Sequence, residues 1–372
     1  RAGEWFDRES SRMEDLLGRH AAGRLVELYR DWMTSALAGA DVELDVSSSL
    51  FDCRGLAAKP GQRAVLEAFT RDYAAAAELY NRAVEETDSG LNPLDARAGE
   101  LPFFATFEHE GRRVRSNARL EDGKVVVCDR SFRLDAEGRL PLEAMADGGI
   151  RSIAGKAALL TIQVRAGEGG ASLALPYRGS LYMPASNRLA RLLAEAGLLD
   201  VEVRPVLRVR LHLLDRLAGL EEPVRLPEHL ADAFGEEVVP AGRIGERWKD
   251  LADEARRRLE SLRDDDARER WQAEAFPDAF AEMRTLDDRR REMARENPKD
   301  PKLREASHRI REIETEVLEA TLRRIARDVQ VAEMDYWDSR GAIGPWCVAI
   351  GGEDFYNHVL DEAEMYEEPS KD

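Results

Sequence analysis

Residues 173–214 read LALPYRGSLYMPASNRLARLLAEAGLLDVEVRPVLRVRLHLL, and this stretch gives the clearest indication of the fold. A short apolar run at 173–176 has the character of a strand. A helix with apolar residues at helical spacing follows and starts at Ser186 or Asn187. Residues 201–214 return to a strand pattern. A strand, a helix and a strand in this order predict parallel pairing, so we expect an α/β fold with a Rossmann-like parallel sheet core.

The pattern before this stretch predicts helices and then a small β-meander. Apolar residues recur at helical spacing as far as about residue 86. Three short strands then fill residues 101–134, with turns at Glu110-Gly111 and Asp122-Gly123 that favour antiparallel hairpins. The apolar segment 153–164 fits either a helix or a strand.

The pattern after this stretch predicts long charged helices. Apolar residues step alternately by three and four, which is coiled-coil spacing, at Leu303, Ala306, Ile310, Ile313 and Val317. The prolines near residue 300 break the pattern, so we expect a long C-terminal antiparallel coiled-coil arm. The predicted organisation is a helical section at 1–100, an α/β core with the meander at 101–240, the arm at 241–338, and a segment at 339–372 that packs back on the core.

The distribution of charge favours a small anionic ligand. The chain has 372 residues and a net charge of −18, which argues against a general nucleic-acid binder. Residues 112–216 nevertheless contain 18 Lys and Arg against 12 Asp and Glu, a local net charge of +6. A basic region in an acidic protein suits an anionic metabolite, although a solvated sheet face explains it equally simply.

The remaining composition points to a cytoplasmic protein without a metal centre. The three cysteines, Cys53, Cys128 and Cys347, lie far apart and form neither a disulfide framework nor a zinc motif. The sequence has no apolar run long enough for a membrane span and no signal peptide, and it indicates no particular cofactor. The absence of an initial Met suggests a trimmed fragment, which leaves room for an N-terminal domain before Arg1.

Polar residues around the predicted helix start form the candidate binding site. Arginine forks hold carboxylates or phosphates, and a helix N-terminus adds partial positive charge. Three further arginines lie at even spacing on the following strand and would share one face. The predicted ligand-binding residues are Arg178, Ser180, Tyr182, Ser186, Asn187, Arg188, Arg204, Arg208 and Arg210.

Structural roles explain several of these residues as well. Ser186 or Asn187 would cap the helix, and Tyr182 would pack against the sheet. The arginines on the strand would then face water or acidic partners. His212 shares the face of those arginines and is the best candidate for acid–base chemistry.

The order of elements resembles a known family. A loop with Leu181-Tyr182-Met183-Pro184-Ala185 precedes a helix, a strand and a coiled coil, and this order is similar to the later two-thirds of the bacillithiol-synthesis cysteine-adding enzymes. The resemblance spans roughly residues 100–360. It implies a Rossmann-like core, a coiled coil, and a reaction that joins cysteine to a glucosaminyl-malate. The family's glycine-rich loop is missing at residues 183–187, and its N-terminal nucleotide-site region is absent, so no catalytic residue is carried over.

Two functions are consistent with these patterns. The first is a ligase- or transferase-like protein that binds a small anionic metabolite. The second is a non-catalytic assembly protein whose coiled-coil arm forms a homodimer or docks a partner. A pocket lined by Arg178, Arg204 and Arg208 would favour the first.

Overall fold

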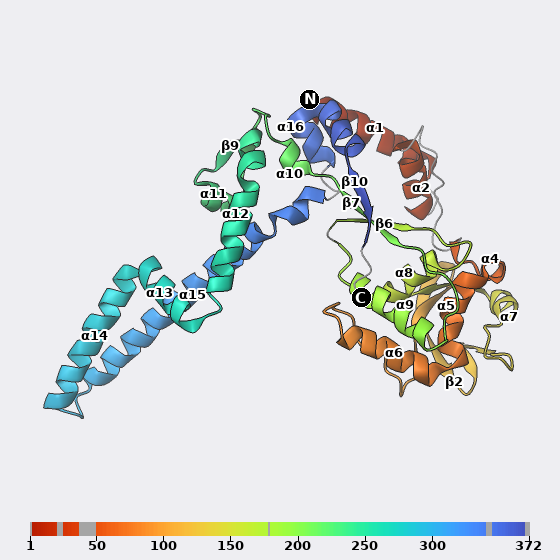
Figure 1. Cartoon of the computed structure of the whole chain (residues 1–372), viewed down its shortest axis with the longest axis horizontal. Coiled ribbons are helices and arrows are strands. Elements are labelled where there is room, and N and C mark those ends of the chain that lie inside the picture. Colours follow the sequence, from red (N-terminus) through yellow and green to blue (C-terminus); the bar gives the residue numbers. More distant parts are fainter. Residues whose placement is uncertain (1, 21–24, 37–49, 178, 340–343, 369–372) are drawn as a thin grey trace. The chain divides into compact units, whose positions relative to one another are not determined.

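The chain folds into two compact units, each with its own hydrophobic core. The computed structural model (Figure 1) describes residues 2–20, 25–36, 50–177, 179–339 and 344–368. The first unit comprises Arg1–Val209 and Glu364–Asp372, and the second comprises Arg210–Ala363. In the sequence, the second unit is therefore an insertion in the first.

An antiparallel sheet of five strands, in the order β4-β3-β2-β1-β5, lies at the centre of the first unit. Two-residue turns join β1 to β2 and β2 to β3. Both residues of each turn have positive φ, as a type I′ turn requires, and the second turn is the Asp122-Gly123 hairpin that the sequence predicts. The strands are β1 (Glu100–His109), β2 (Arg112–Glu121), β3 (Lys124–Val127), β4 (Arg130–Arg133) and β5 (Ile150–Gly155).

The predicted Rossmann-like parallel core is wrong. Parallel pairing joins β6 (Leu173–Pro176) to β7 (Val206–Arg210) through the helix α9 (Met183–Glu195), in a small sheet of order β10-β7-β6. The central sheet is antiparallel, because two-residue turns can join only antiparallel neighbours. A Rossmann sheet needs several successive strand–helix–strand crossovers, and residues 173–210 supply one. The second predicted strand is also much shorter than residues 201–214.

Helices cover the central sheet and provide much of the first core. Val65, Leu66 and Phe69 are fully buried on one face of α5. The ambiguous segment 153–164 is divided between the end of β5 and the helix α8. These helices are α4 (Cys53–Ala57), α5 (Pro60–Arg71), α6 (Tyr73–Glu85), α7 (Leu142–Asp147) and α8 (Ala157–Arg165). The helices α1 (Ala2–Arg19) and α2 (Leu25–Ala36) precede them and pack against each other.

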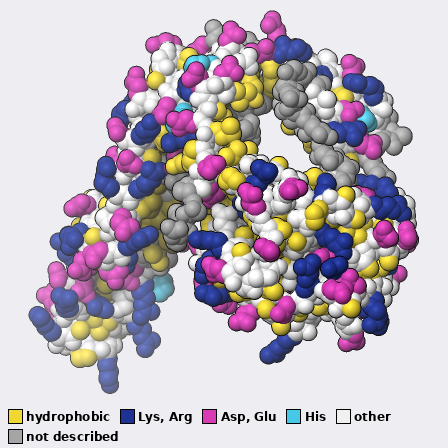
Figure 2. All heavy atoms as spheres, turned by 45° about the vertical axis from the view of Figure 1, so that its right-hand side comes forward, with side chains coloured by type: hydrophobic (Ala, Val, Ile, Leu, Met, Phe, Trp, Pro, Cys, Tyr) yellow, Lys and Arg dark blue, Asp and Glu magenta, His cyan; other side chains and the backbone are white. Residues whose placement is uncertain are grey.

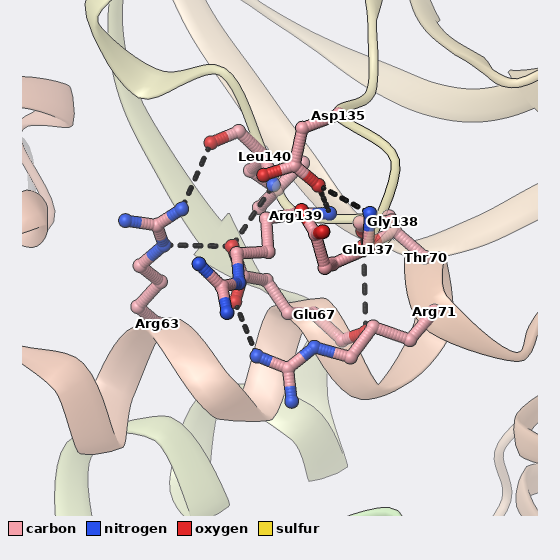
Figure 3. A network of polar contacts seen from close by, with 9 residues as sticks. All are labelled: Arg63, Glu67, Thr70, Arg71, Asp135, Glu137, Gly138, Arg139 and Leu140. Atoms are coloured by element: carbon pink, nitrogen blue, oxygen red, sulfur yellow. Dashed lines mark hydrogen bonds and ion pairs between the residues drawn. The ribbon is translucent and has the colours of Figure 1, made fainter.

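A polar clamp fastens α5 to the loop that follows β4 (Figure 3). The Glu67 carboxylate, 2% exposed, accepts hydrogen bonds from Arg63 Nε at 2.6 Å, Arg71 Nη2 at 2.9 Å and the Leu140 backbone N–H at 2.9 Å. The Thr70 hydroxyl donates to the Gly138 carbonyl at 2.7 Å. Because Glu67 is paired with two arginines and a backbone donor, its burial is compensated.

The second unit is mostly helical. Its long helix α15 (Lys302–Ala332) packs against α14 (Pro277–Glu296) and α12 (Ala241–Ser261), and Ile313 and Val317 lie buried on its inner face. The other elements are α10 (Leu213–Arg216), β8 (Pro223–Arg225), α11 (Glu228–Phe234), β9 (Val238–Pro240), α13 (Asp265–Ala275), the 3₁₀ helix η1 (Met334–Ser339) and α16 (Gly344–Asp361).

Acidic and basic side chains alternate on the outside of these long helices, at the lower left of Figure 2. Apolar side chains are nevertheless exposed on α15, where Leu318 and Leu322 are 53% and 56% accessible. Of the helices within the described ranges, none is long and apolar enough to cross a membrane.

Candidate functional site

A cavity of about 1070 Å³ lies beside α9 in the first unit, and we call it the α9 cavity. Its walls come from the end of α6, the end of α8, one face of α9, the segment 199–206 and the C-terminal residues 367–368. The apolar part of the lining consists of Pro184, Ala190, Ala194, Leu199, Val201, Val203, Pro205 and Val206. The cavity is as large as the biggest pockets that usually hold small molecules.

Arg165 is the buried cation of this cavity. It ends α8 and is only 4% exposed. Its guanidinium donates to the Thr161 carbonyl at 2.8 Å, the Arg204 carbonyl at 3.0 Å and the Asn187 side-chain oxygen at 3.1 Å. All three acceptors are neutral, so the positive charge has no ion pair within 4 Å in the described part of the chain. Burial accordingly lowers the pKa of Arg165, and the negative charge of Glu368 partly opposes that shift.

The backbone holds Arg165 and Arg204 side by side. The Arg204 N–H donates to the Arg165 carbonyl at 3.0 Å, and the Gly167 N–H donates to the Glu202 carbonyl at 2.8 Å. Gly167 has a φ of +72° and lies so close to Gly61 that a Cβ there would meet backbone at 2.8 Å. A glycine is therefore required at this junction between α5 and α8.

A carboxylate between two arginines forms another wall. Glu86 accepts from Arg188 Nε at 2.6 Å and from Arg82 Nε at 2.7 Å. These hydrogen bonds lower the pKa of Glu86 to about 2 and raise the pKa of Arg188. Glu86 therefore neutralises the positive charge of Arg188, and this ion pair links α9 to the end of α6.

Arg204 is the cation most available to a ligand. Its side chain is exposed and lines the cavity, and within the described ranges its guanidinium has no hydrogen bond or ion pair. Among the predicted ligand-binding residues, Asn187, Arg188 and Arg204 therefore line one cavity. Arg178, a central residue of that prediction, lies outside the described residues.

The helix starts earlier than the sequence pattern predicts, at Met183 instead of Ser186 or Asn187. Residues 186–188 therefore lie inside it. The Met183 N–H donates to the Ser180 carbonyl, the Ser186 N–H donates to the Tyr182 carbonyl, and Pro184 has no N–H. Ser186 is fully buried, and its hydroxyl contacts Thr161 Oγ1 and donates to the Ala158 carbonyl at 3.0 Å. Ser186 therefore joins α8 to α9.

Arg208 is held by partners within the first unit. It is 8% exposed and donates to the carbonyls of Pro176 at 3.1 Å and Gly179 at 3.2 Å. Its Nη2 also lies 3.1 Å from Glu368 Oε2, an ion pair without the alignment of a hydrogen bond.

Arg210 and His212 belong to the second unit and do not line the α9 cavity. Arg210 Nε lies 3.5 Å from Asp338 Oδ2, and His212 Nδ1 lies 3.7 Å from Asp215 Oδ2. Burial raises the pKa of Asp338. In the described part of the chain, no group of three or more His, Cys, Asp or Glu side chains is placed to hold a metal ion.

Arg165, Glu86 and Glu368 were not predicted from the sequence as residues of this site. Arg165 ends an apolar helix and has the appearance of an ordinary C-terminal arginine. Glu86 lies 102 residues from its partner Arg188, and Glu368 belongs to the acidic tail of the chain. The excess of basic residues at 112–216, which includes Arg165, is the one sequence signal that points to it.

Comparison of the chain with known protein families, with curated proteins and with solved structures finds no match.

Proposed function

We propose that the first unit binds a small anionic metabolite in the α9 cavity. The observation that carries this proposal is the pair Arg165 and Arg204, which face one cavity without a direct carboxylate partner in the described part of the chain. The charge of Glu368 offsets the burial of the Arg165 guanidinium only in part, because its hydrogen-bond acceptors are all neutral, and a bound carboxylate or phosphate would offset more of that cost.

The lining also indicates the shape of the ligand. Arg165, Asn187 and Arg204 supply donors at one side, and the alanine, valine and leucine side chains supply an apolar wall. A metabolite that carries a carboxylate or phosphate on a partly apolar body matches both parts. A free inorganic ion would leave the apolar wall uncovered.

The test is calorimetric titration with citrate, glucuronate and phosphate. Arg204→Ala should weaken binding about tenfold or more, because a charge-assisted hydrogen bond contributes about 1.5–3 kcal/mol. The ligand-free melting temperature should stay unchanged, since the Arg204 side chain is exposed and has no partner in the described residues. Added salt should weaken binding.

Arg133→Ala is the matched control. Arg133 is an exposed arginine of the same unit, on β4, and does not line the cavity. Equal affinities for the wild type, Arg204→Ala and Arg133→Ala would rule out the cavity as the binding site. Absence of binding to all three anions would count against the ligand class.

The ligase- or transferase-like activity stays a proposal on the resemblance in element order alone, because the central sheet is antiparallel and is not the Rossmann-like core that the resemblance implies. In that case the α9 cavity would hold the anionic acceptor. Mass spectrometry after incubation with cysteine, ATP and glucosaminyl-malate should detect the coupled product, and its formation should decline in Arg204→Ala. A protein that binds anions but forms no product would be a binding protein.

A homodimer through α15 is a second proposal, supported by exposed apolar side chains at coiled-coil spacing. Leu318, Leu322 and Val329 are 53%, 56% and 41% accessible, and Ile325 lies between them. Sedimentation should show a dimer that Leu322→Asp dissociates, while the helix content is retained. A wild-type monomer would contradict this proposal.

A further inference from the structure

The C-terminal residues 364–368, which we call the C-terminal strap, reach the α9 cavity. The strand β10 (Glu364–Glu367) lies at the edge of the small sheet beside β7, and the Glu368 N–H donates to the Val206 carbonyl at 2.7 Å. The ring of Tyr366 meets that of Tyr177 edge to face, with 6.4 Å between centroids. Glu367 and Glu368 both line the cavity.

The strap brings a carboxylate into the lining of the cavity, where it pairs with the neighbouring Arg208. The Glu368 carboxylate is ion-paired with Arg208 at 3.1 Å, and its negative charge also acts on the buried Arg165. Its Oε2 atom is buried and has no aligned hydrogen bond in the described part of the chain. The ion pair is thus weaker than the bidentate pair that a free carboxylate can form with arginine.

The strap is also weakly attached. All four residues of β10 are exposed, and Met365 is 65% accessible. A short exposed edge strand opens at a lower cost than unfolding of the whole unit, because few apolar contacts are lost. Release of the strap would remove two carboxylates from the cavity and take the carboxylate partner away from Arg208.

We propose that the C-terminal strap is an autoinhibitory element whose Glu368 carboxylate occupies the place of the ligand's anionic group. This inference rests on the proposed function of the α9 cavity and adds its regulation. Ligand and strap compete, so the apparent affinity is reduced by the fraction of molecules in which the strap is closed. An anion should bind and release the strap in one coupled step.

The test compares citrate binding to the full chain, Glu368→Gln and Glu364→Gln by calorimetry. Glu368→Gln should bind about tenfold more tightly, because the internal competitor loses its charge. Glu364→Gln is the matched control, since it removes the same charge from the strap at a residue that does not line the cavity. Its affinity should equal that of the wild type within about a factor of two.

Hydrogen exchange in the full chain provides the second measurement. Saturating citrate should accelerate exchange of the amides at 364–368 and slow exchange at 199–206. Equal or weaker binding by Glu368→Gln, with clear binding by the wild type, would overturn the autoinhibition and leave the binding site intact. If neither the wild type nor Glu368→Gln bound citrate, both the autoinhibition by the strap and the proposed function would be overturned.

Discussion

At the scale of single residues, the Glu67 clamp should be the most sensitive polar site of the first unit (Figure 3). Glu67→Ala leaves the buried Leu140 N–H without an acceptor, while Arg63 and Arg71 can turn toward water. We expect a loss of about 2–3 kcal/mol in the free energy of unfolding, measured by urea denaturation.

Glu67→Gln is the control for this prediction. Its amide keeps an oxygen for the Leu140 N–H and loses only the charge, so it should cost clearly less than Glu67→Ala. If the two variants were equally stable, the Leu140 hydrogen bond would have no measurable part in the clamp.

The lowered pKa of the Glu86 carboxyl group predicts that the stability of the fold depends on pH. The pKa of Glu86 in the folded chain is about 2, below the ordinary value of 4.5, because Arg188 and Arg82 stabilise the carboxylate. The contribution is therefore fully present above about pH 4.5 and is lost as the pH falls through about 2. The melting temperature of Glu86→Gln should lie below that of the wild type at neutral pH, and the two should converge on acidification.

Glu85→Gln is the control for the pH series. Glu85 is exposed, is the last residue of α6 directly before Glu86, and has no ion pair within the described ranges. Its melting curve should follow the wild type at every pH. A constant gap between the wild type and Glu86→Gln down to pH 2 would contradict the lowered pKa.

The residues of the α9 cavity show what a sequence can predict at this scale. Asn187, Arg188 and Arg204 were predicted because a polar set near a helix and a row of arginines are local patterns. Glu86 and Glu368 could not be predicted, since they reach the cavity through contacts between segments far apart in the chain. Arg165 could not be predicted either, because its burial depends on how residues 201–204 lie against α8.

At the scale of elements, the turn between β2 and β3 should resist substitution. Gly123 has a φ of +71°, and a Cβ there would meet no atom within 4 Å. Gly123→Val therefore tests backbone strain alone, and we expect a loss of about 1–3 kcal/mol by urea denaturation. Gly169→Val is the control, because Gly169 is equally open and its φ is not positive. Equal stability of the two variants would contradict the turn geometry.

The buried face of α15 supports a second prediction for an element. Ile313 is 1% exposed, so Ile313→Asp places an unpaired charge in the core. We expect a loss of about 3 kcal/mol or more, detected by thermal denaturation followed by circular dichroism. Thr315→Asp, at an exposed position of the same helix, should be tolerated. An unchanged melting temperature of Ile313→Asp would show that this face is not packed.

The elements also show why the predicted fold was only partly right. The hairpin at Asp122-Gly123 and the apolar face of α15 follow from spacing within one segment, which the sequence displays directly. Strand pairing depends on distant segments. The unit β6-α9-β7 exists, yet it belongs to a small separate sheet with β10, and the five-stranded sheet is antiparallel. One crossover unit does not establish a whole parallel sheet.

At the scale of the whole molecule, the two cores should respond separately to mutation. The first core uses residues between Cys53 and Leu199, and the second uses residues between Leu214 and Ile350. Among the described residues the two cores have no member in common, so a substitution in one core should change the free energy of unfolding of its own unit. The insertion of one unit into the sequence of the other does not by itself couple them.

Hydrogen exchange measured by mass spectrometry tests this separation. Glu67→Ala should accelerate exchange in residues 50–209 and leave residues 210–363 unchanged, because the clamp holds the first unit. Ile313→Asp should have the opposite distribution, because its core belongs to the second unit. The double variant should reproduce the sum of both patterns. Acceleration across the whole chain in either single variant would mean that the two units unfold as one cooperative structure.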